Sequence, residues 1–481
     1  MKNLTIVLAG IICMTARVYG QDIEQMMDAR SFTWYGNISA YAEAYDPEGI
    51  EPRGGTLNWG LNGNAGFSVY GWDVPFAFSV GRQRSSFNYP IYNQFGLSPK
   101  YKWVTVHLGH RNLYFSPFTL GGHTMQGVGF ELNPGQLRIG AMAGTLRKPV
   151  QIRPEDINEV VPAYRRQGYA IKVGLGTNEN YVDLTFFKAK DDSTSLENPF
   201  NPDLTPGANT ALGLSVRRQL GKGLHLELES GLSVYTRDQA SDLFVEDQEE
   251  SFWGKIFDLR YSTRINIATK AMLEYQKGKW RTRFGYDRID PEYETMGTYY
   301  FENDVEKFVL GISGPVNTII SVQANAGLQH NNLLETRNAR TSRFVGSANA
   351  DIHPKPHYGV NISYSNFNMQ QKESLVPLND SARLSNASQT IVISPRYSIL
   401  KGEKTHSFSL TLMDQFLNNK NPLNAAGGDF KSKYITFMYA VNLDAMHQVS
   451  AGVNWNRISI GDFRSGQYGG SAGYQFHWVE K

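Results

Sequence analysis

A two-residue alternation of side-chain character recurs along this chain and restricts what it can fold into. Between Leu57 and Tyr70, apolar or small residues occupy every second position, and Asn, Gly and Ser fill most positions between them. Similar alternation returns at 169–176, 224–229 and 435–443. Because successive side chains of a β-strand point to opposite faces, each segment predicts a strand with one apolar and one polar face. We therefore expect an all-β chain.

The connections between these segments alternate in length. Tight turns rich in Gly, Pro and Asn occur at 133–135 and 221–223, for example, and long polar stretches such as 190–208 and 238–254 fall between the turns. A β-sandwich also alternates along its strands. Short turns on one rim and long loops on the other are instead typical of bacterial outer-membrane barrels, whose short turns face the periplasm. No run of about 18 to 20 apolar residues predicts a transmembrane helix.

These patterns predict a single transmembrane antiparallel β-barrel with short periplasmic turns and long extracellular loops. Hairpins of roughly 40 residues give about 20 to 22 strands, and an even number is expected for a single-chain barrel. The stretch from Tyr101 to Gly127 breaks the rhythm. It forms either an extra strand or a segment folded into the lumen. A soluble β-propeller is disfavoured, since Trp72-Asp73 occurs without a regular blade repeat.

The first residues predict export. Lys2 precedes an apolar run from Leu4 to Met14, which is too short to span a bilayer and is followed by Val18-Tyr19-Gly20, where cleavage before Gln21 is expected. We expect a signal peptide at 1–20, a short periplasmic segment at 21–30, and the barrel at 31–481, in the outer membrane of a Gram-negative bacterium. The only cysteine lies inside the signal peptide, so the mature chain has no disulfide. A net charge of +2 gives no indication of a nucleic-acid partner.

Charged side chains alternate with the apolar positions of several predicted strands, which directs them into the lumen. On the lipid face at mid-bilayer, an Arg or Lys would cost about 2 to 4 kcal/mol. Two interpretations remain open: a solvated or ion-paired lining that holds the barrel's shape, or a selectivity region that discriminates between solutes. The lumen-lining candidates are Arg138, Lys172, Asp183, Arg217, Glu227, Glu229, Arg281 and Arg283.

Two arginines are candidates for binding outer-membrane lipids. Arg82 and Arg84 follow Val80 and two phenylalanines on the same outward face, in a strand that rises toward a long loop. That position lies just beyond the apolar band, where lipid phosphates can accept hydrogen bonds from guanidinium groups. The alternative is a plain solvated rim.

The last strand carries aromatic rings at every second position. Tyr474, Phe476 and Trp478 resemble the C-terminal signal that the barrel assembly machinery recognises, which makes that machinery an expected partner. The alternative is that the rings only anchor the wall at the membrane interface, where aromatic side chains are enriched.

Signals for catalysis, such as those of an embedded lipase or protease, are poor in this sequence. His107 and His110 lie near Ser116, but a period of two places these histidines on opposite faces, and no nucleophile elbow or triad is recognisable. His353 and His357 share a proline-stiffened turn without thiol or carboxylate companions. We expect no enzyme activity, no catalytic residues, no metal and no cofactor.

Three stretches resemble known proteins: "GLSPKYKWVTVHLGHRNLYFSPFTLGGHTMQGVGFE", "YDRIDPEYETMGTYYFEND" and "GLQHNN". They are similar to segments of porin-like outer-membrane β-barrel proteins of Bacteroidota. The resemblance implies a barrel in the outer membrane and brings no assigned substrate and no catalytic residue.

The function predicted from these features is that of a porin-like barrel that passes small hydrophilic solutes or a specific ligand across the outer membrane. The alternative is a barrel that conducts little and serves as a subunit of a secretion, adhesin-anchoring or surface-lipoprotein assembly. In that case an envelope protein is its partner.

Overall fold

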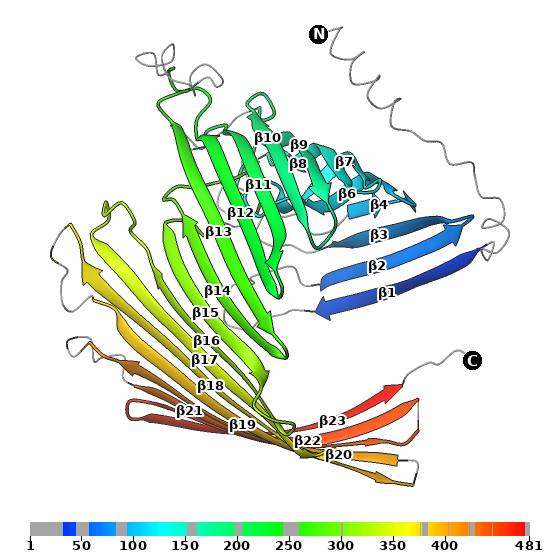
Figure 1. Cartoon of the computed structure of the whole chain (residues 1–481), viewed down its shortest axis with the longest axis vertical. Coiled ribbons are helices and arrows are strands. Elements are labelled where there is room, and N and C mark those ends of the chain that lie inside the picture. Colours follow the sequence, from blue (N-terminus) through cyan, green and yellow to red (C-terminus); the bar gives the residue numbers. More distant parts are fainter. Residues whose placement is uncertain are drawn as a thin grey trace. The chain divides into compact units, whose positions relative to one another are not determined.

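The computed structural model describes residues 32–44, 57–82, 94–151, 161–197, 204–243, 259–299, 302–375, 377, 383–402, 404–421, 423, 429–444 and 446–476. Their regular structure consists of 23 β-strands (Figure 1). No helix in these ranges is long and apolar enough to cross a membrane. The predicted signal peptide and the periplasmic segment after it lie outside the described residues.

The chain divides into two compact units. The first comprises Met1–Leu113, Thr124–Tyr169 and Asp192–Leu204, and the second comprises Tyr114–His123, Ala170–Asp191 and Thr205–Lys481. The strands of the N-terminal part are β1 (Thr33–Ala44), β2 (Leu57–Val69), β3 (Trp72–Arg82), β4 (Gln94–Leu97), β5 (Lys100–Tyr101), β6 (Val104–Tyr114), β7 (Gly121–Leu132) and β8 (Leu137–Arg147).

The remaining strands are longer on average. They are β9 (Arg165–Gly176), β10 (Tyr181–Asp192), β11 (Ala208–Gly221), β12 (Leu224–Thr236), β13 (Thr263–Lys277), β14 (Trp280–Ile289), β15 (Val305–Pro315), β16 (Ile320–His330), β17 (Ala339–Lys355), β18 (Tyr358–Glu373), β19 (Ser385–Lys401), β20 (Lys404–Asn419), β21 (Phe430–Asn442), β22 (His447–Ile460) and β23 (Phe463–Phe476).

In the first unit, β4 and β5 together form one interrupted strand. Both pair antiparallel with β3 and with β6, and their registers continue each other across the gap. Ser98 and Pro99 make the interruption. Pro99 has no N–H to donate to the neighbouring strand, although its carbonyl still accepts a bond of 2.9 Å from the Val106 amide. Counting β4 and β5 as one leaves 22 strand positions among the described residues, an even number within the predicted range.

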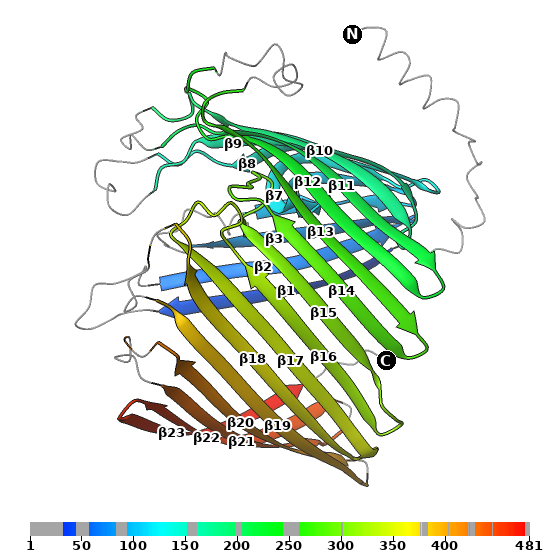
Figure 2. The same cartoon turned by 60° about the vertical axis from the view of Figure 1, so that its left-hand side comes forward.

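In the second unit, β10 to β23 form an uninterrupted antiparallel meander. Each strand pairs with the next along the chain, from β10–β11 to β22–β23 (Figure 2). Several strands exceed the roughly 9 to 11 residues that a tilted strand needs to cross a bilayer. For example, β17 and β19 have 17 residues each. Their ends therefore extend beyond the apolar layer.

The sheet of the second unit is apolar on its exposed face. In β10, Leu184 is 62% exposed, whereas its neighbours Asp183 and Thr185 are each 3% exposed. We call the face of Leu184 the outer face and the face of Asp183 the inner face, and the strand registers extend both definitions across the meander. A soluble sheet would bury the leucine side and expose the aspartate side. The observed inversion is that of a wall whose outer face meets lipid.

Connections alternate between tight turns at one end of the strands and longer segments at the other. Two-residue turns join β11 to β12, β13 to β14 and β17 to β18, while the connection from β12 to β13 runs from Arg237 to Ser262. The prediction of long loops at one end fails once. Gly461 and Asp462 join β22 to β23 at the long-loop end in a two-residue turn, with Gly461 at φ 55°. A glycine-aspartate pair accommodates such a tight hairpin turn.

The predicted fold class is confirmed: the protein is all-β and antiparallel, with the strand arrangement and apolar outer face of a membrane β-barrel. The irregular stretch from Tyr101 to Gly127 contains β6 and β7, and the connection between them packs on the inner face of the second unit.

Candidate functional site

The inner face of the second unit carries the chemistry that faces away from the apolar side. Successive cross-strand pairs place Asp183 beside Ser215 and Arg217 beside Glu227. They also place Glu274 beside Arg283. Seven of the eight predicted lumen-lining residues lie on this face: Lys172, Asp183, Arg217, Glu227, Glu229, Arg281 and Arg283.

Most of these charges are balanced within the sheet. Arg217 contacts Glu227 at 2.7 Å. Glu274, which the sequence reasoning did not single out, accepts from Arg281 at 3.1 Å and from Arg283 at 2.7 Å. The three arginines and Glu227 are about half exposed and Glu274 is 23% exposed, so each pair contributes little to stability. Their geometry favours an ion-paired lining that holds neighbouring strands together.

Two charges of this face are held by a connecting segment. Glu229 accepts hydrogen bonds from Ser215 at 2.5 Å and from Ser116 at 3.2 Å. The ammonium of Lys172 lies 4.9 Å from the centre of the Phe115 ring, a cation–π contact. Ser116 and Phe115 belong to the connection between β6 and β7, which therefore lies against the inner face.

Two connections meet on this part of the inner face, and we name them the first inner loop (115–120) and the second inner loop (290–299). Phe118 of the first and Tyr293 of the second are fully buried and pack edge to face, with ring centres 5.8 Å apart. They form a small core with three inner-face residues of β13 to β15, namely Ala268, Ile289 and Val305. Burial of two aromatic rings fixes both loops on the sheet.

Hydrogen bonds join the two loops directly. The hydroxyl of Tyr293 donates to the Phe118 carbonyl at 2.7 Å, and the Thr295 hydroxyl donates to the Thr119 carbonyl at 2.9 Å. Met296 donates its amide to Asn209 of β11 at 3.1 Å. Burial raises the pKa of the Tyr293 phenol, which keeps this group a neutral donor.

Glycines of the sheet allow the loops to approach. A Cβ atom at Gly231 of β12 would lie 2.3 Å from the Cβ of Phe118 and 2.5 Å from the Tyr293 hydroxyl. A Cβ at Gly213 of β11 would lie 2.9 Å from the Thr119 side chain. Any side chain at Gly231 would occupy the space of the first inner loop.

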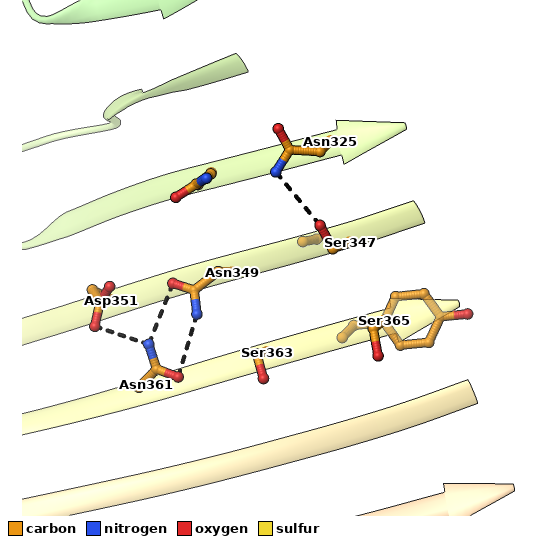
Figure 3. Close-up of a pocket in the computed structure, with 10 residues that line it drawn as sticks. Asn325, Ser347, Asn349, Asp351, Asn361, Ser363 and Ser365 are labelled. Atoms are coloured by element: carbon orange, nitrogen blue, oxygen red, sulfur yellow. Dashed lines mark hydrogen bonds between the residues drawn. The ribbon is translucent and has the colours of Figure 1, made fainter. Parts of the chain in front are cut away.

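From β16 onward the inner face changes character. Amide and hydroxyl side chains of β16 to β18 line a pocket with a cavity volume of about 360 Å³ (Figure 3). Asn349 and Asn361 exchange reciprocal amide hydrogen bonds of 3.3 Å, and Asn361 also donates to Asp351 at 3.0 Å. Asp351 is the one charged side chain of the lining. The pocket therefore presents alternating donors and acceptors with little net charge.

The uncharged character continues to the last strand. Inner-face positions of β19 to β23 hold Ser, Thr, Asn, Gln and Gly together with apolar residues, and Arg396 is the one charged side chain among them. Arg396 is hydrogen-bonded to the ring of His353 from β17. No described connecting segment contributes to the pocket lining, which comes entirely from β16 to β18. Among the described residues, this part of the face is therefore mostly polar with few charges, which include Arg343 of β17 opposite Gln329.

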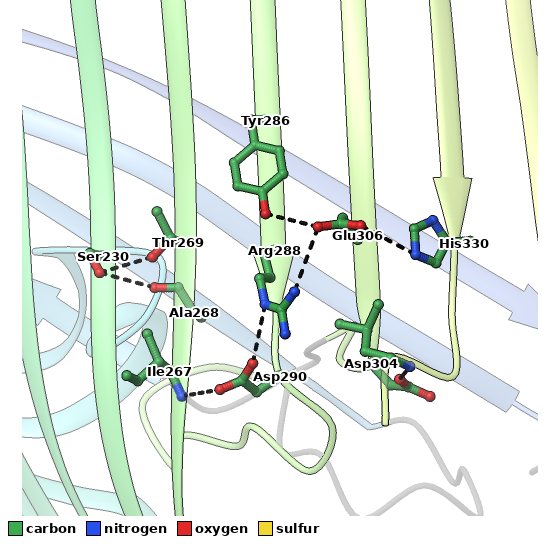
Figure 4. A network of polar contacts seen from close by, with 11 residues as sticks. Ser230, Ile267, Ala268, Thr269, Tyr286, Arg288, Asp290, Asp304, Glu306 and His330 are labelled. Atoms are coloured by element: carbon green, nitrogen blue, oxygen red, sulfur yellow. Dashed lines mark hydrogen bonds and ion pairs between the residues drawn. The ribbon is translucent and has the colours of Figure 1, made fainter. Parts of the chain in front are cut away.

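The outer face carries a polar network at its long-loop end. Glu306 of β15 accepts from the Tyr286 hydroxyl at 2.9 Å, and lies 3.6 Å from Arg288 and 3.3 Å from His330 (Figure 4). Arg288 also lies 3.7 Å from Asp290. Its charge is therefore balanced by two carboxylates of its own chain.

The other predicted site residues lie as follows. Arg138 of β8 lies on the same face of its strand as the buried Met142. Arg82 is the last residue of β3 and pairs with Trp59 of β2. Tyr474 and Phe476 are on the outer face of β23, where Tyr474 hydrogen-bonds His447 at 2.6 Å. Arg84 and Trp478 lie outside the described residues.

A serine, a histidine and a glutamate come together in the first unit. Ser98 lies 2.8 Å from Nδ1 of His107, whose Nε2 lies 3.3 Å from Glu131. Nε of Arg111 also donates to the Ser98 hydroxyl, at 2.6 Å. Ser98 and His107 are both buried, and the serine oxygen is engaged on both sides. The cluster secures the interruption between β4 and β5, where Ser98 lies. The described residues contain no group of three metal-ligating side chains.

Sequence reasoning missed several residues of this face. Glu274 alternates with apolar residues in the sequence as clearly as Glu227 does, so periodicity could have found it. The positions of Asn349, Asp351 and Asn361 show the same period of two. The search for charged residues did not include the neutral amides among them. No local sequence pattern predicted the contact between Phe118 and Tyr293, because it joins segments 175 residues apart.

Comparisons with known proteins add solved structures of low similarity. No protein-family model and no characterised sequence matches the chain. The P pilus usher (PapC) translocation pore is 12% identical, with 94% of this chain and 99% of that chain covered and a TM-score of 0.37. Outer-membrane expressed OmpT of Vibrio cholerae is 12% identical, with 72% and 100% covered and a TM-score of 0.30. OccD1 (OprD) is 9% identical, with 89% and 93% covered and a TM-score of 0.29. TM-scores this low do not define a fold, which rests here on the strands, their registers and the exposed apolar face.

Proposed function

We propose that this protein is a porin-like barrel of the outer membrane that passes small, uncharged hydrophilic solutes. The observation that carries the proposal is the change along the inner face of the second unit. One part is charged and packed against the inner loops, whereas the face from β16 to β23 consists mainly of amide, hydroxyl and apolar side chains with few charges, and no described connecting segment lines its pocket. Such groups replace the hydrogen bonds of water for a passing polyol without trapping an ion.

Export and assembly complete the proposal. The signal peptide at 1–20 directs the chain across the inner membrane, and the aromatic side chains at Tyr474, Phe476 and Trp478 serve recognition by the barrel assembly machinery. Fractionation with outer membranes, and a different gel mobility before and after boiling, are the expected properties of a folded barrel. Recovery as a soluble periplasmic protein would contradict both.

Two measurements on the purified protein test transport. In planar bilayers we expect stable conductance steps with weak ion selectivity, because the inner face from β16 to β23 carries few charges. In proteoliposomes we expect faster entry of small neutral sugars than of charged solutes of similar size. Conductance with strong ion selectivity, or exclusion of sugars, would refute a neutral pathway.

The alternative is a barrel subunit that conducts little within an envelope assembly. One observation favours it: the two inner loops are fixed on the sheet by buried aromatic side chains and direct hydrogen bonds. A protein without conductance steps that co-purifies with an envelope protein would support this alternative.

A further inference from the structure

Four basic residues gather on the outer face at the long-loop end of the last three strands. Lys431 and Lys433 stand two positions apart in β21, and Lys433 lies directly opposite Arg457 of β22. Arg464 of β23 lies opposite Ser459, which places it diagonally across from Arg457. All four are exposed. We call these residues the cation cluster.

Carboxylates of the described chain do not balance this cluster. Asp414 of β20 lies 3.8 Å from Lys433, at the limit of an ion pair. No ion pair within the described residues joins Lys431, Arg457 or Arg464 to an acid. Asp429 and Asp462 lie in the neighbouring connections and make no described ion pair with the cluster. Like charges directly opposite each other on adjacent strands are destabilising. An external anion bound between Lys433 and Arg457 would remove this repulsion.

The sequence of side chains along each strand places the cluster at the edge of the lipid layer. On β22 the outer face runs through Val449, Ala451 and Val453 to Trp455, and Arg457 follows. Trp455 pairs with the exposed Tyr468 of β23. Trp and Tyr rings concentrate at the depth of lipid headgroups. The cation cluster lies one step beyond that depth, where lipid phosphates are.

The polar network of β14 to β16 lies at the same end of the outer face and differs in one respect. There Arg288 has Glu306 and Asp290 as internal partners, and His330 has Glu306. That network needs no anion from outside. The cation cluster has four cations for one distant carboxylate and is exposed to the membrane edge.

We infer that the cation cluster of Lys431, Lys433, Arg457 and Arg464 binds the headgroup of a lipid with clustered phosphates, of the lipid A class, on the long-loop side of the membrane. Guanidinium groups bind phosphate oxygens through paired, charge-assisted hydrogen bonds. Basic residues at a membrane edge are attracted to anionic lipid surfaces. This inference requires only that the apolar outer face meets lipid, so it holds whether or not the barrel conducts.

The test uses the folded full-length protein in detergent and measures lipid retention by native mass spectrometry. The probes are lipid A, a phosphate-free galactosyl diacylglycerol, and inorganic phosphate as competitor. The test variant is Arg457→Gln with Arg464→Gln. The matched control is Lys401→Gln with Lys404→Gln, a directly opposed outer-face pair at the short-turn end, which removes the same charge.

Lipid A should bind the native protein at least roughly tenfold more tightly than the Arg457→Gln, Arg464→Gln variant, and the control should retain native affinity. The galactolipid should not distinguish the three proteins, and inorganic phosphate should compete only weakly. Equal lipid A binding by all three proteins would overturn the inference. So would an equal loss in the control, which indicates unspecific charge attraction, or full competition by inorganic phosphate, which indicates a free-anion site. Unchanged gel mobility of each variant before boiling confirms that it is folded.

Discussion

The inner face of the second unit offers two neighbouring surfaces built from the same strand geometry. From β10 to β15 it carries ion pairs such as Arg217–Glu227 and is packed against the two inner loops. From β16 to β23 it carries mainly amide, hydroxyl and apolar side chains with few charges such as Arg343 and Arg396, and its pocket is lined by the strands alone. The difference shows that one sheet can supply a structural support and an open polar surface side by side. Glycines under the loops allow the loops to pack closely on the sheet. Neutral side chains make up most of the second surface.

The largest expected effect comes from removing the core beneath the loops. Replacing Phe118 and Tyr293 with Ala should lower the free energy of unfolding by several kcal/mol, since loss of one large buried aromatic side chain costs about 3 to 5 kcal/mol. The measurement is the temperature at which the folded gel species disappears. Phe308→Ala is the control, because this ring is 41% exposed on the outer face. If the double variant is as heat-resistant as the control, the loops are not fixed as described.

Displacing the first inner loop without removing its side chains is the next largest change. Gly231→Ala places a Cβ atom 2.3 Å from that of Phe118 and should destabilise the protein by about 1 to 3 kcal/mol. Single-channel conductance should rise if the displaced loop leaves the charged surface. Gly285→Ala is the matched control on the same face, since its Cβ would meet Val309 at 3.6 Å, an ordinary contact. An equal response of the two variants would remove the distinction between a covered and an uncovered surface.

A charge change among the ion pairs of β13 and β14 should alter selectivity more than stability. Glu274→Gln leaves Arg281 and Arg283 without their shared carboxylate, so the reversal potential in a salt gradient should shift toward anion preference. Stability should change by about 1 kcal/mol or less, because both arginines are about half exposed to solvent. Asp414→Asn removes a charge of the same sign from the outer face and should leave the reversal potential unchanged. A shift of equal size there would show that selectivity does not arise on the inner face.

The smallest effect is expected in the uncharged pocket. Asn361→Ala removes hydrogen bonds to Asn349 and Asp351, and the open pocket lets water replace them. The free energy of unfolding should fall by about 0.5 to 1.5 kcal/mol, the range of a single solvated hydrogen bond. Neutral sugar entry into proteoliposomes should change measurably, whereas Asn325→Ala, which loses one contact of 3.5 Å, should change it less. The reverse order would place the sugar pathway elsewhere.

Periodicity predicted the strands and their faces well, and it placed seven lumen candidates of the second unit on one face. It could not predict that β4 and β5 continue as one strand across Ser98 and Pro99. The shared register of β4 and β5 comes from their pairing with β3 and β6. It also missed the tight turn at Gly461 and Asp462. A short turn motif in the sequence does not indicate at which end of the barrel the turn lies.

The side to which each strand residue points was determined by the sequence alone, because successive side chains alternate through local backbone geometry. That is why Asp183 and Leu184 could be assigned to opposite faces without any partner strand. Which residues meet across the inner face was decided only by the tertiary structure. Phe118 and Tyr293 are 175 residues apart, and their contact depends on the accumulated register of the strands between them, which no local pattern records.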